Sequence, residues 1–206
     1  MRALIIVDVQ NDFLPGGALA VPEGDKVIPV INELQEKFDF IVATQDWHPA
    51  DHSSFASQHP GKSPGDIVVV EGEDQILWPD HCVQGSFGAE FHQDLKQSNW
   101  RKVFQKGQNK LVDSYSGFHD NARKADTGLA DYLLAQEVSE VYIVGLATDY
   151  CVKFTVLDAL KEGFDTYVIE DASKAVNINP NDFTLALKDM SKSGAEIIRS
   201  RDISPE

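Results

Sequence analysis

Cys151 is the residue of this chain best placed for covalent chemistry. It lies in the run GLATDYCV, residues 145–152, where an apolar strand pattern gives way to a helical one. With Thr148 as the expected N-cap, the thiol falls in the first helical turn. There, unpaired backbone N–H groups and the helix dipole lower the pKa of a thiol and can bind an oxyanion. The position therefore indicates a nucleophile, although a small buried apolar role is the alternative.

A carboxylate and an ammonium group can serve such a thiol. Asp8 follows the apolar run Ala3–Val7, and Lys106 precedes Gly107 in a polar stretch. Asp8 can accept a thiol proton, and Lys106 can lower the pKa of the carboxylate and stabilise developing negative charge. The simpler alternatives are that Asp8 caps a turn and that Lys106 is solvated. Lys110 lies close by in the sequence and is a second candidate for the cation.

Four of the six histidines lie between residues 48 and 81, which suggests a metal site. Asp46 and His48 are two residues apart, so on an extended segment they point the same way, and His81 offers a second imidazole. One carboxylate and two imidazoles suit a divalent transition metal with positions left for water. The spacing matches no common short zinc motif. Cys82 is a conceivable fourth ligand, but a buried structural thiol is the more usual role.

Three aromatic residues, Phe13, Trp78 and Tyr115, lie on predicted loops near these positions. They can form an apolar slot for a planar ring. Packing in the core is the alternative.

Short apolar strands alternate with helical patterns along the whole chain. The predicted strands are Ala3–Val7, Phe40–Thr44, Lys102–Gln105, Glu140–Leu146, Asp165–Glu170 and Ala195–Arg199. The predicted helices are 27–38 (with Asp25 as N-cap), Asp126–Ala135, Thr148–Lys161 and Asn181–Met190. Continuously apolar strands separated by helices indicate a sheet buried on both faces. We therefore predict an α/β fold, a doubly wound, mainly parallel six-stranded sheet with helices on both faces, which is Rossmann-like.

The predicted fold also explains how the reactive residues meet. In open parallel sheets, ligands bind beyond the carboxyl ends of the strands. Asp8, Asp46 and Lys106 each follow a strand, and Cys151 opens the helix after another. We expect all four to share one edge of the sheet.

Length and composition favour one soluble domain, residues 1–206. Within it, the His-, Pro- and Gly-rich stretch of about 46–90 is a long functional loop insertion. A net charge of −15 argues against nucleic acid and anionic membranes as partners. Two cysteines are too few for a disulfide scaffold, and no apolar run reaches bilayer length. We therefore expect a cytoplasmic protein with reduced thiols.

Several motifs resemble those of the isochorismatase-like cysteine hydrolases. The start IVDVQNDF with PGG, residues 6–17, resembles that family's first strand and loop. The runs QDWHP (45–49), HSSFA (52–56), WPDHC (78–82), FQKG (104–107) and YSGF (115–118) resemble its nicotinamidase branch, and GLATDYCV resembles its nucleophile motif. The matches extend from residue 2 to about 200 and are jointly very specific.

The resemblance implies hydrolysis of nicotinamide to nicotinate and ammonia in NAD salvage, with pyrazinamide as a related substrate. It makes Asp8, Lys106 and Cys151 a catalytic triad with Asp8 as general base. It assigns the oxyanion hole to the amides of Ala147 and Cys151, after a cis Leu146–Ala147 peptide. It implies that Phe13, Trp78 and Tyr115 bind the substrate ring. It makes Asp46, His48 and His81 ligands of one divalent metal ion, zinc before iron or manganese.

His52 is a possible further metal ligand, but its spacing from His48 is shorter than in family members that use such a histidine. A homo-oligomer is possible. Other hydrolases of the superfamily, an N-carbamoyl amidase or an isochorismatase, are alternatives, but the Asp46, His48 and His81 set argues against them. The three triad candidates argue against a non-catalytic metal-binding protein.

Overall fold

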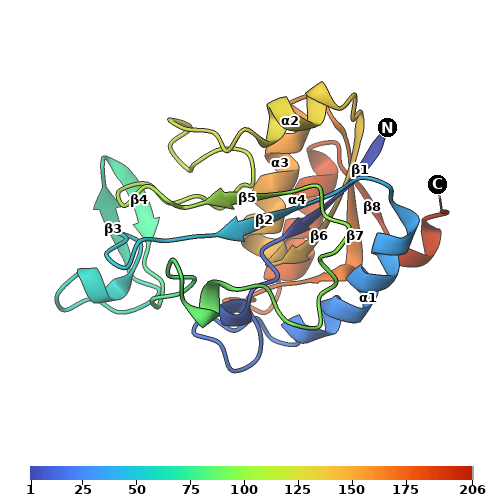
Figure 1. The fold of residues 1–206 in the computed structure, drawn as a ribbon. Coiled ribbons are helices and arrows are strands. Elements are labelled where there is room, and N and C mark those ends of the chain that lie inside the picture. The colour runs from blue at the N-terminus through green and yellow to red at the C-terminus, as the bar shows by residue number, and fades with distance from the viewer. Residues whose placement is uncertain (206) are drawn as a thin grey trace.

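A central six-stranded sheet organises the protein in the computed structural model, which describes residues 1–205 (Figure 1). The strand order is β5-β2-β1-β6-β7-β8, and all five pairings are parallel. The strands are β1 Arg2–Val7, β2 Ile41–Asp46, β5 Lys102–Lys106, β6 Glu140–Leu146, β7 Asp165–Lys174 and β8 Glu196–Ile198. The predicted fold class is confirmed, and each predicted strand is present within a few residues.

Helices cover both faces of the sheet (Figure 1). They are α1 Val27–Leu34, α2 Leu129–Ala135, α3 Lys153–Lys161 and α4 Asp182–Lys192. Leu4 and Ile6 of β1 belong to the core on the α1 side, whereas Ile5 and Val7 belong to the core that includes α2, α3 and α4. Alternate side chains of a strand point to opposite faces, so β1 is buried on both sides. Burying each large aliphatic side chain contributes about 1.5–3 kcal/mol.

The centre of the sheet sets the position of the reactive edge. Val7, the last residue of β1, lies opposite Thr44 of β2 and Gly145 of β6. A Cβ at Gly145 would stand 2.1 Å from the carbonyl oxygen of Val7, and its φ is +114°. Only glycine permits this approach. The residues after β1, β2 and β6 therefore emerge side by side.

The starts of two predicted helices were wrong in detail. Asp25 is not the N-cap of α1, because it lies inside a 3-10 turn, Gly24–Lys26, that precedes the helix. Thr148 is not an N-cap either: the segment Thr148–Val152 is a π-helical turn, and α3 begins only at Lys153. The Thr148 hydroxyl instead forms a hydrogen bond with Ser173 on β7.

The long stretch after β2 contains a hairpin that we did not predict. Strands β3, Ile67–Val70, and β4, Glu73–Ile76, pair antiparallel apart from the main sheet. The sequence of β3 is entirely apolar, yet Ile67 and Val69 are exposed. An apolar run of this kind does not reveal which of its faces is buried.

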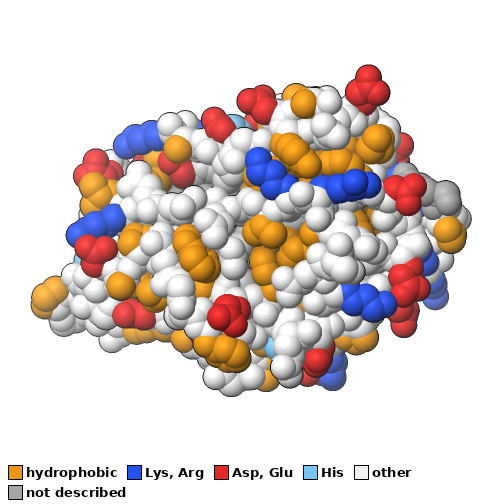
Figure 2. All heavy atoms as spheres, viewed as in Figure 1, with side chains coloured by type: hydrophobic (Ala, Val, Ile, Leu, Met, Phe, Trp, Pro, Cys, Tyr) orange, Lys and Arg blue, Asp and Glu red, His pale blue; other side chains and the backbone are white. Residues whose placement is uncertain are grey.

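The surface carries both signs of charge. On the face that Figure 2 shows, Lys and Arg side chains are scattered among acidic, hydrophobic and uncharged ones. Within residues 1–205, no helix is both long enough and apolar enough to cross a membrane.

Candidate active site

Asp8, Lys106 and Cys151 come together at the carboxyl edge of the sheet, as expected. The Lys106 Nζ lies 2.8 Å from Asp8 Oδ2 and 3.5 Å from the Cys151 Sγ. All three residues are buried. Lys110, the competing lysine, is exposed and pairs with Asp51. Lys106 is therefore the cation of this cluster.

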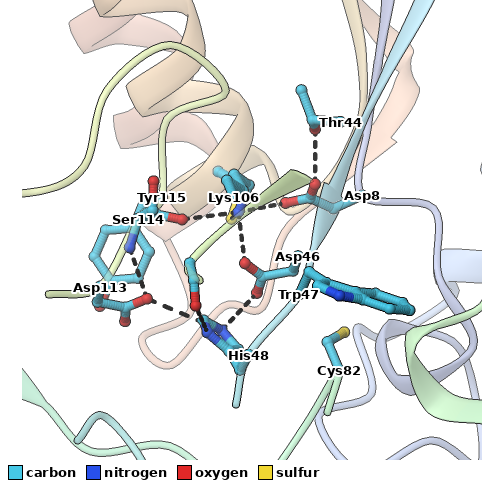
Figure 3. A network of polar contacts seen from close by, with 12 residues as sticks. Asp8, Thr44, Asp46, Trp47, His48, Cys82, Lys106, Asp113, Ser114 and Tyr115 are labelled. Carbon is cyan, nitrogen blue, oxygen red and sulfur yellow. Dashed lines mark hydrogen bonds and ion pairs between the residues drawn. The ribbon is translucent and has the colours of Figure 1, made fainter. Parts of the chain in front are cut away.

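The Lys106 ammonium group also links the triad to the metal candidates (Figure 3). It donates to Asp46 Oδ1 at 2.9 Å and to the carbonyl oxygen of Ser114 at 2.8 Å. Two buried carboxylates thus flank one buried ammonium group. Such a cluster is tolerated only when its charges are paired and its hydrogen bonds are made.

The pKa directions differ from the sequence expectation. Burial raises the pKa of the Cys151 thiol well above its usual value, against the lowering effect of Lys106, and Asp8 raises it further. Burial likewise raises the pKa of Asp8, although Lys106 acts in the opposite direction. Lys106 lowers the pKa of both groups, as expected for the carboxylate, but the expected net lowering of the thiol pKa was wrong because full burial outweighs it. Burial thus favours the neutral form of the Cys151 thiol, so an attack by its sulfur needs a base.

Asp8 is in position to be that base. Its Oδ1 accepts a hydrogen bond of 2.7 Å from the Thr44 hydroxyl, and its carboxylate contacts the Cys151 thiol. Thr44 lies on β2 and is fully buried. A base that is held by a second group and contacts its nucleophile has the geometry of general base catalysis.

The backbone before Cys151 has an irregular hydrogen-bond pattern. The Leu146–Ala147 peptide is cis, as the resemblance implied. The carbonyl of Ala147 accepts the N–H groups of Tyr150 and Val152, one on each side of Cys151 in the chain. The thiol therefore lies in a tight turn directly after β6 rather than in a regular α-helical turn.

Asp46, His48 and His81 form a group able to hold a metal ion. All three are buried, and one potential ligand atom from each lies within 4.8 Å of the other two. His48 Nε2 is 3.0 Å and His81 Nε2 is 3.4 Å from Asp46 Oδ2. The structure thus brings together the three predicted ligands.

The Nδ1 atoms of His48 and His81 contact backbone carbonyls. His48 Nδ1 lies 2.8 Å from the oxygen of Gly107, and His81 Nδ1 lies 2.7 Å from that of Pro79. A carbonyl only accepts, so each Nδ1 carries a proton, and each Nε2 faces Asp46 Oδ2. Although burial opposes it, Asp46 raises the pKa of His48 to about 9. His48 and Lys106 hold the pKa of Asp46 well below its usual value despite burial. The pocket between these groups favours a cation, so the donor set fits a divalent metal.

A second group lies behind the first. His48, His52 and Asp113 are buried and also offer mutually close ligand atoms. His52 Nε2 is buried without a hydrogen-bond partner, and its Nδ1 lies 2.7 Å from the Ser54 hydroxyl. Neither group contains Cys82, which packs in the core as a free thiol.

The three predicted ring-binding residues line one cleft with the reactive ones. Phe13, Trp78 and Tyr115 surround it together with Cys151 and Ala147. The Trp78 indole N–H donates to the Tyr115 hydroxyl at 3.1 Å. Asp46 and His81 also reach this cleft. An apolar slot thus connects the thiol with the metal candidates.

Sequence reasoning missed several residues of this site. They are Leu19, Tyr150, Val176 and Asp113 in the cleft wall, and Thr44 and the Ser114 carbonyl behind it. Thr44 had a usable signal, because it shares a strand face with Asp46. Leu19, Asp113, Ser114 and Val176 come from loops without a period, whereas Tyr150 lies in the π-helical turn that carries Cys151. Size gives no guide either: a hollow of about 710 Å³ beside α1 is lined by none of the triad or metal candidates.

Comparison with known proteins defines the class. The Isochorismatase domain model matches residues 2–202, so the chain belongs to the isochorismatase family. It is 52% identical to the nicotinamidase of Escherichia coli (strain K12), over 98% of this chain and 96% of that protein.

Two solved structures extend the comparison. An Acinetobacter baumanii nicotinamidase/pyrazinamidase superimposes with a TM-score of 0.95 at 46% identity, covering 98% of both chains. The pyrazinamidase of Pyrococcus horikoshii in complex with zinc superimposes with a TM-score of 0.78 at 43% identity, covering 96% of this chain and 98% of that one. The resemblance seen in the sequence is confirmed.

Proposed function

We propose that this chain hydrolyses nicotinamide to nicotinate and ammonia, with Cys151 as the nucleophile. The observation that carries the proposal is the buried Asp8–Lys106–Cys151 cluster, whose Cys151 lines a cleft together with Asp46 and His81. The resemblance to nicotinamidases over nearly the whole chain supports the substrate. The physiological role is NAD salvage, and pyrazinamide is a second substrate.

The first half-reaction forms a thioester. Asp8 takes the thiol proton of Cys151, and the sulfur attacks the amide carbon. The amides of Ala147 and Cys151 bind the oxyanion, and Lys106 stabilises negative charge beside them. The C–N bond breaks as Asp8 returns the proton to the nitrogen, which leaves as ammonia.

The second half-reaction releases the acid. Asp8 removes a proton from water, which attacks the thioester carbon. The C–S bond breaks, the sulfur recovers the proton from Asp8, and nicotinate leaves. Phe13, Trp78 and Tyr115 hold the ring in place throughout, so that the carbonyl stays close to the sulfur.

Asp46, His48 and His81 would hold one divalent metal ion, with zinc as the proposed metal. The zinc complex of the Pyrococcus pyrazinamidase supports this choice. When bound, such an ion supplies a Lewis acid that can orient the pyridine nitrogen. We further propose that residues 46–90 form the metal-holding insertion of a single domain. The Asp46, His48 and His81 group also disfavours N-carbamoyl amidase and isochorismatase activities.

A substrate panel tests the proposal. Purified protein supplied with zinc is incubated with nicotinamide, pyrazinamide and an N-carbamoyl amine, and ammonia and the acid product are measured. We expect equal amounts of ammonia and acid from the first two substrates and none from the third. Absence of nicotinate from folded, zinc-loaded protein would contradict the proposal.

A further inference from the structure

Thr155 makes two hydrogen bonds directly behind the nucleophile. It lies on α3, is fully buried, and donates its hydroxyl proton to the carbonyl oxygen of Cys151 at 2.6 Å. The Thr155 hydroxyl oxygen, Oγ1, in turn accepts a hydrogen bond from the N–H of Gly117 at 2.9 Å. An amide N–H only donates and a carbonyl only accepts, so both directions are fixed. The hydroxyl therefore ties the turn that carries Cys151 to Gly117.

Gly117 closes a short stretch that we call the 114–117 segment, residues 114 to 117. Its first residue, Ser114, accepts the Lys106 ammonium group through its carbonyl. Its second, Tyr115, lines the cleft and accepts the Trp78 indole N–H. The segment thus reaches both the triad cation and the ring slot.

The segment also packs against the support of the general base. A Cβ at Gly117 would stand 2.6 Å from the Thr44 methyl carbon and 3.6 Å from the methyl carbon of Thr155. Thr44 in turn donates its hydroxyl to Asp8. Gly117 is therefore wedged between the threonine that holds the base and the threonine behind the nucleophile.

We propose that Thr155 is a positioning residue that fixes the Cys151 turn relative to Lys106 and the cleft wall, acting through the 114–117 segment. The inference rests on the proposed thiol chemistry. Without the hydroxyl, the Gly117 N–H loses its acceptor inside the protein. The turn is then free to shift, and a small displacement of a nucleophile lowers the rate strongly while ring binding is retained.

Three substitutions at one position separate the hydroxyl from its methyl group. Thr155→Ser removes the methyl group and keeps the hydroxyl. Thr155→Ala removes both groups. Thr155→Val replaces the hydroxyl with a methyl group at nearly constant volume. For nicotinamide we expect kcat/KM within about threefold of wild type for Ser and lower by about tenfold or more for Ala and Val. The Kd of nicotinate should stay within about twofold in all three. If Thr155→Val fails to fold, the difference in kcat/KM between Thr155→Ser and Thr155→Ala tests the role of the hydroxyl.

A matched control removes a similar bond elsewhere. Thr166 is buried on β7 and donates to the Phe164 carbonyl oxygen at 2.9 Å. Thr166→Val should lower the Tm but leave kcat/KM unchanged, because a merely structural loss does not move the nucleophile.

A second readout does not depend on the substrate. The rate of Cys151 alkylation by iodoacetamide against pH is followed by mass spectrometry of its peptide. We expect Thr155→Ala to change this profile and Thr155→Ser to retain it. Equal kcat/KM and equal alkylation profiles for Ser and Ala would overturn the proposal. Wild-type protein that is alkylated at Cys151 but leaves nicotinamide intact would instead count against the proposed function, and the alkylation comparison would still decide the role of Thr155.

Discussion

Asp46 and Lys106 form a buried ion pair of 2.9 Å that joins the two halves of the site. One oxygen of Asp46 accepts from Lys106, and the other faces His48 and His81. Charge at the metal candidates is thus felt directly by the cation of the triad. This single carboxylate therefore joins the metal candidates to the triad cation.

Removing the triad cation should damage stability and activity together. Lys106→Met leaves Asp8 and Asp46 buried without their shared partner, which should lower the free energy of unfolding by about 3–5 kcal/mol. Nicotinamide hydrolysis should fall by at least about 100-fold. Lys110→Met is the control, because Lys110 forms only an exposed pair and should change stability by less than about 1 kcal/mol. Urea unfolding and ammonia release measure both effects, and wild-type stability of Lys106→Met would contradict the ion-pair account.

The two buried thiols should behave differently. Cys151→Ala should abolish nicotinate formation while nicotinate binding persists, because only the attacking atom is lost. Cys82→Ala should remain active, since Cys82 belongs only to the core. Mass spectrometry during turnover should detect a nicotinoyl adduct on Cys151 in the wild type alone. Turnover by Cys151→Ala near the wild-type rate would refute the nucleophile.

Metal content should follow the buried histidines. His81→Ala removes an inward Nε2 and should lower metal affinity by more than about tenfold, because a ligand is lost. His92→Ala changes a partly exposed histidine outside both ligand groups and should retain the metal. Inductively coupled plasma mass spectrometry after chelation and reloading gives the metal per chain. Equal metal content in the two variants would exclude His81 as a ligand.

Asp8 should set the acidic limit of the reaction. The mechanism needs its ionised form, and burial raises its pKa, so activity is lost as pH falls through a value above that of an exposed aspartate. Thr44→Val removes a hydrogen bond that lowers the pKa of Asp8. The acidic limb of kcat/KM should therefore move to higher pH. A limb that stays in place in Thr44→Val would assign it to another group.

Gly145 should be irreplaceable where β1 and β6 meet. Gly145→Ala places a Cβ 2.1 Å from the Val7 carbonyl oxygen, so the strands must separate, and we expect a loss of more than about 4 kcal/mol. Gly163→Ala is the control. Its φ of +92° is also positive, but nothing lies within 4 Å, so it should cost only about 1–2 kcal/mol of backbone strain. Thermal and urea unfolding of the two variants make the comparison.

Much of the fold could be predicted from the sequence because β1 and β6 are almost continuously apolar, and polar residues follow each of them within two positions. The family and the parallel six-stranded sheet are confirmed, and so is the resemblance to nicotinamidases. The strand-end rule also brought Asp8 and Lys106 together correctly. The roles of the site residues stay proposals.

Other features depend on tertiary structure and were out of reach. The π-helical turn at Cys151 follows from how β6 meets α3, not from residue propensity. The raised pKa of Asp8 depends on full burial, which a residue type does not disclose. In the sequence, Thr155 is one more residue of a predicted helix. Only the structure shows its hydrogen bonds with the Gly117 N–H and the Cys151 carbonyl.

The central place of β1 has a consequence for how the molecule is made. β1 pairs with β2 on one side and with β6 on the other, where Arg2 lies opposite Glu140. During synthesis, the ribosome therefore delivers Asp8, the proposed general base, long before β6, the strand that completes its surroundings, and Cys151 follows β6. Long-range parallel pairing of this kind closes late and slowly. A nascent chain that ends before residue 151 lacks the thiol, so the proposed hydrolysis requires that most of the polypeptide has emerged.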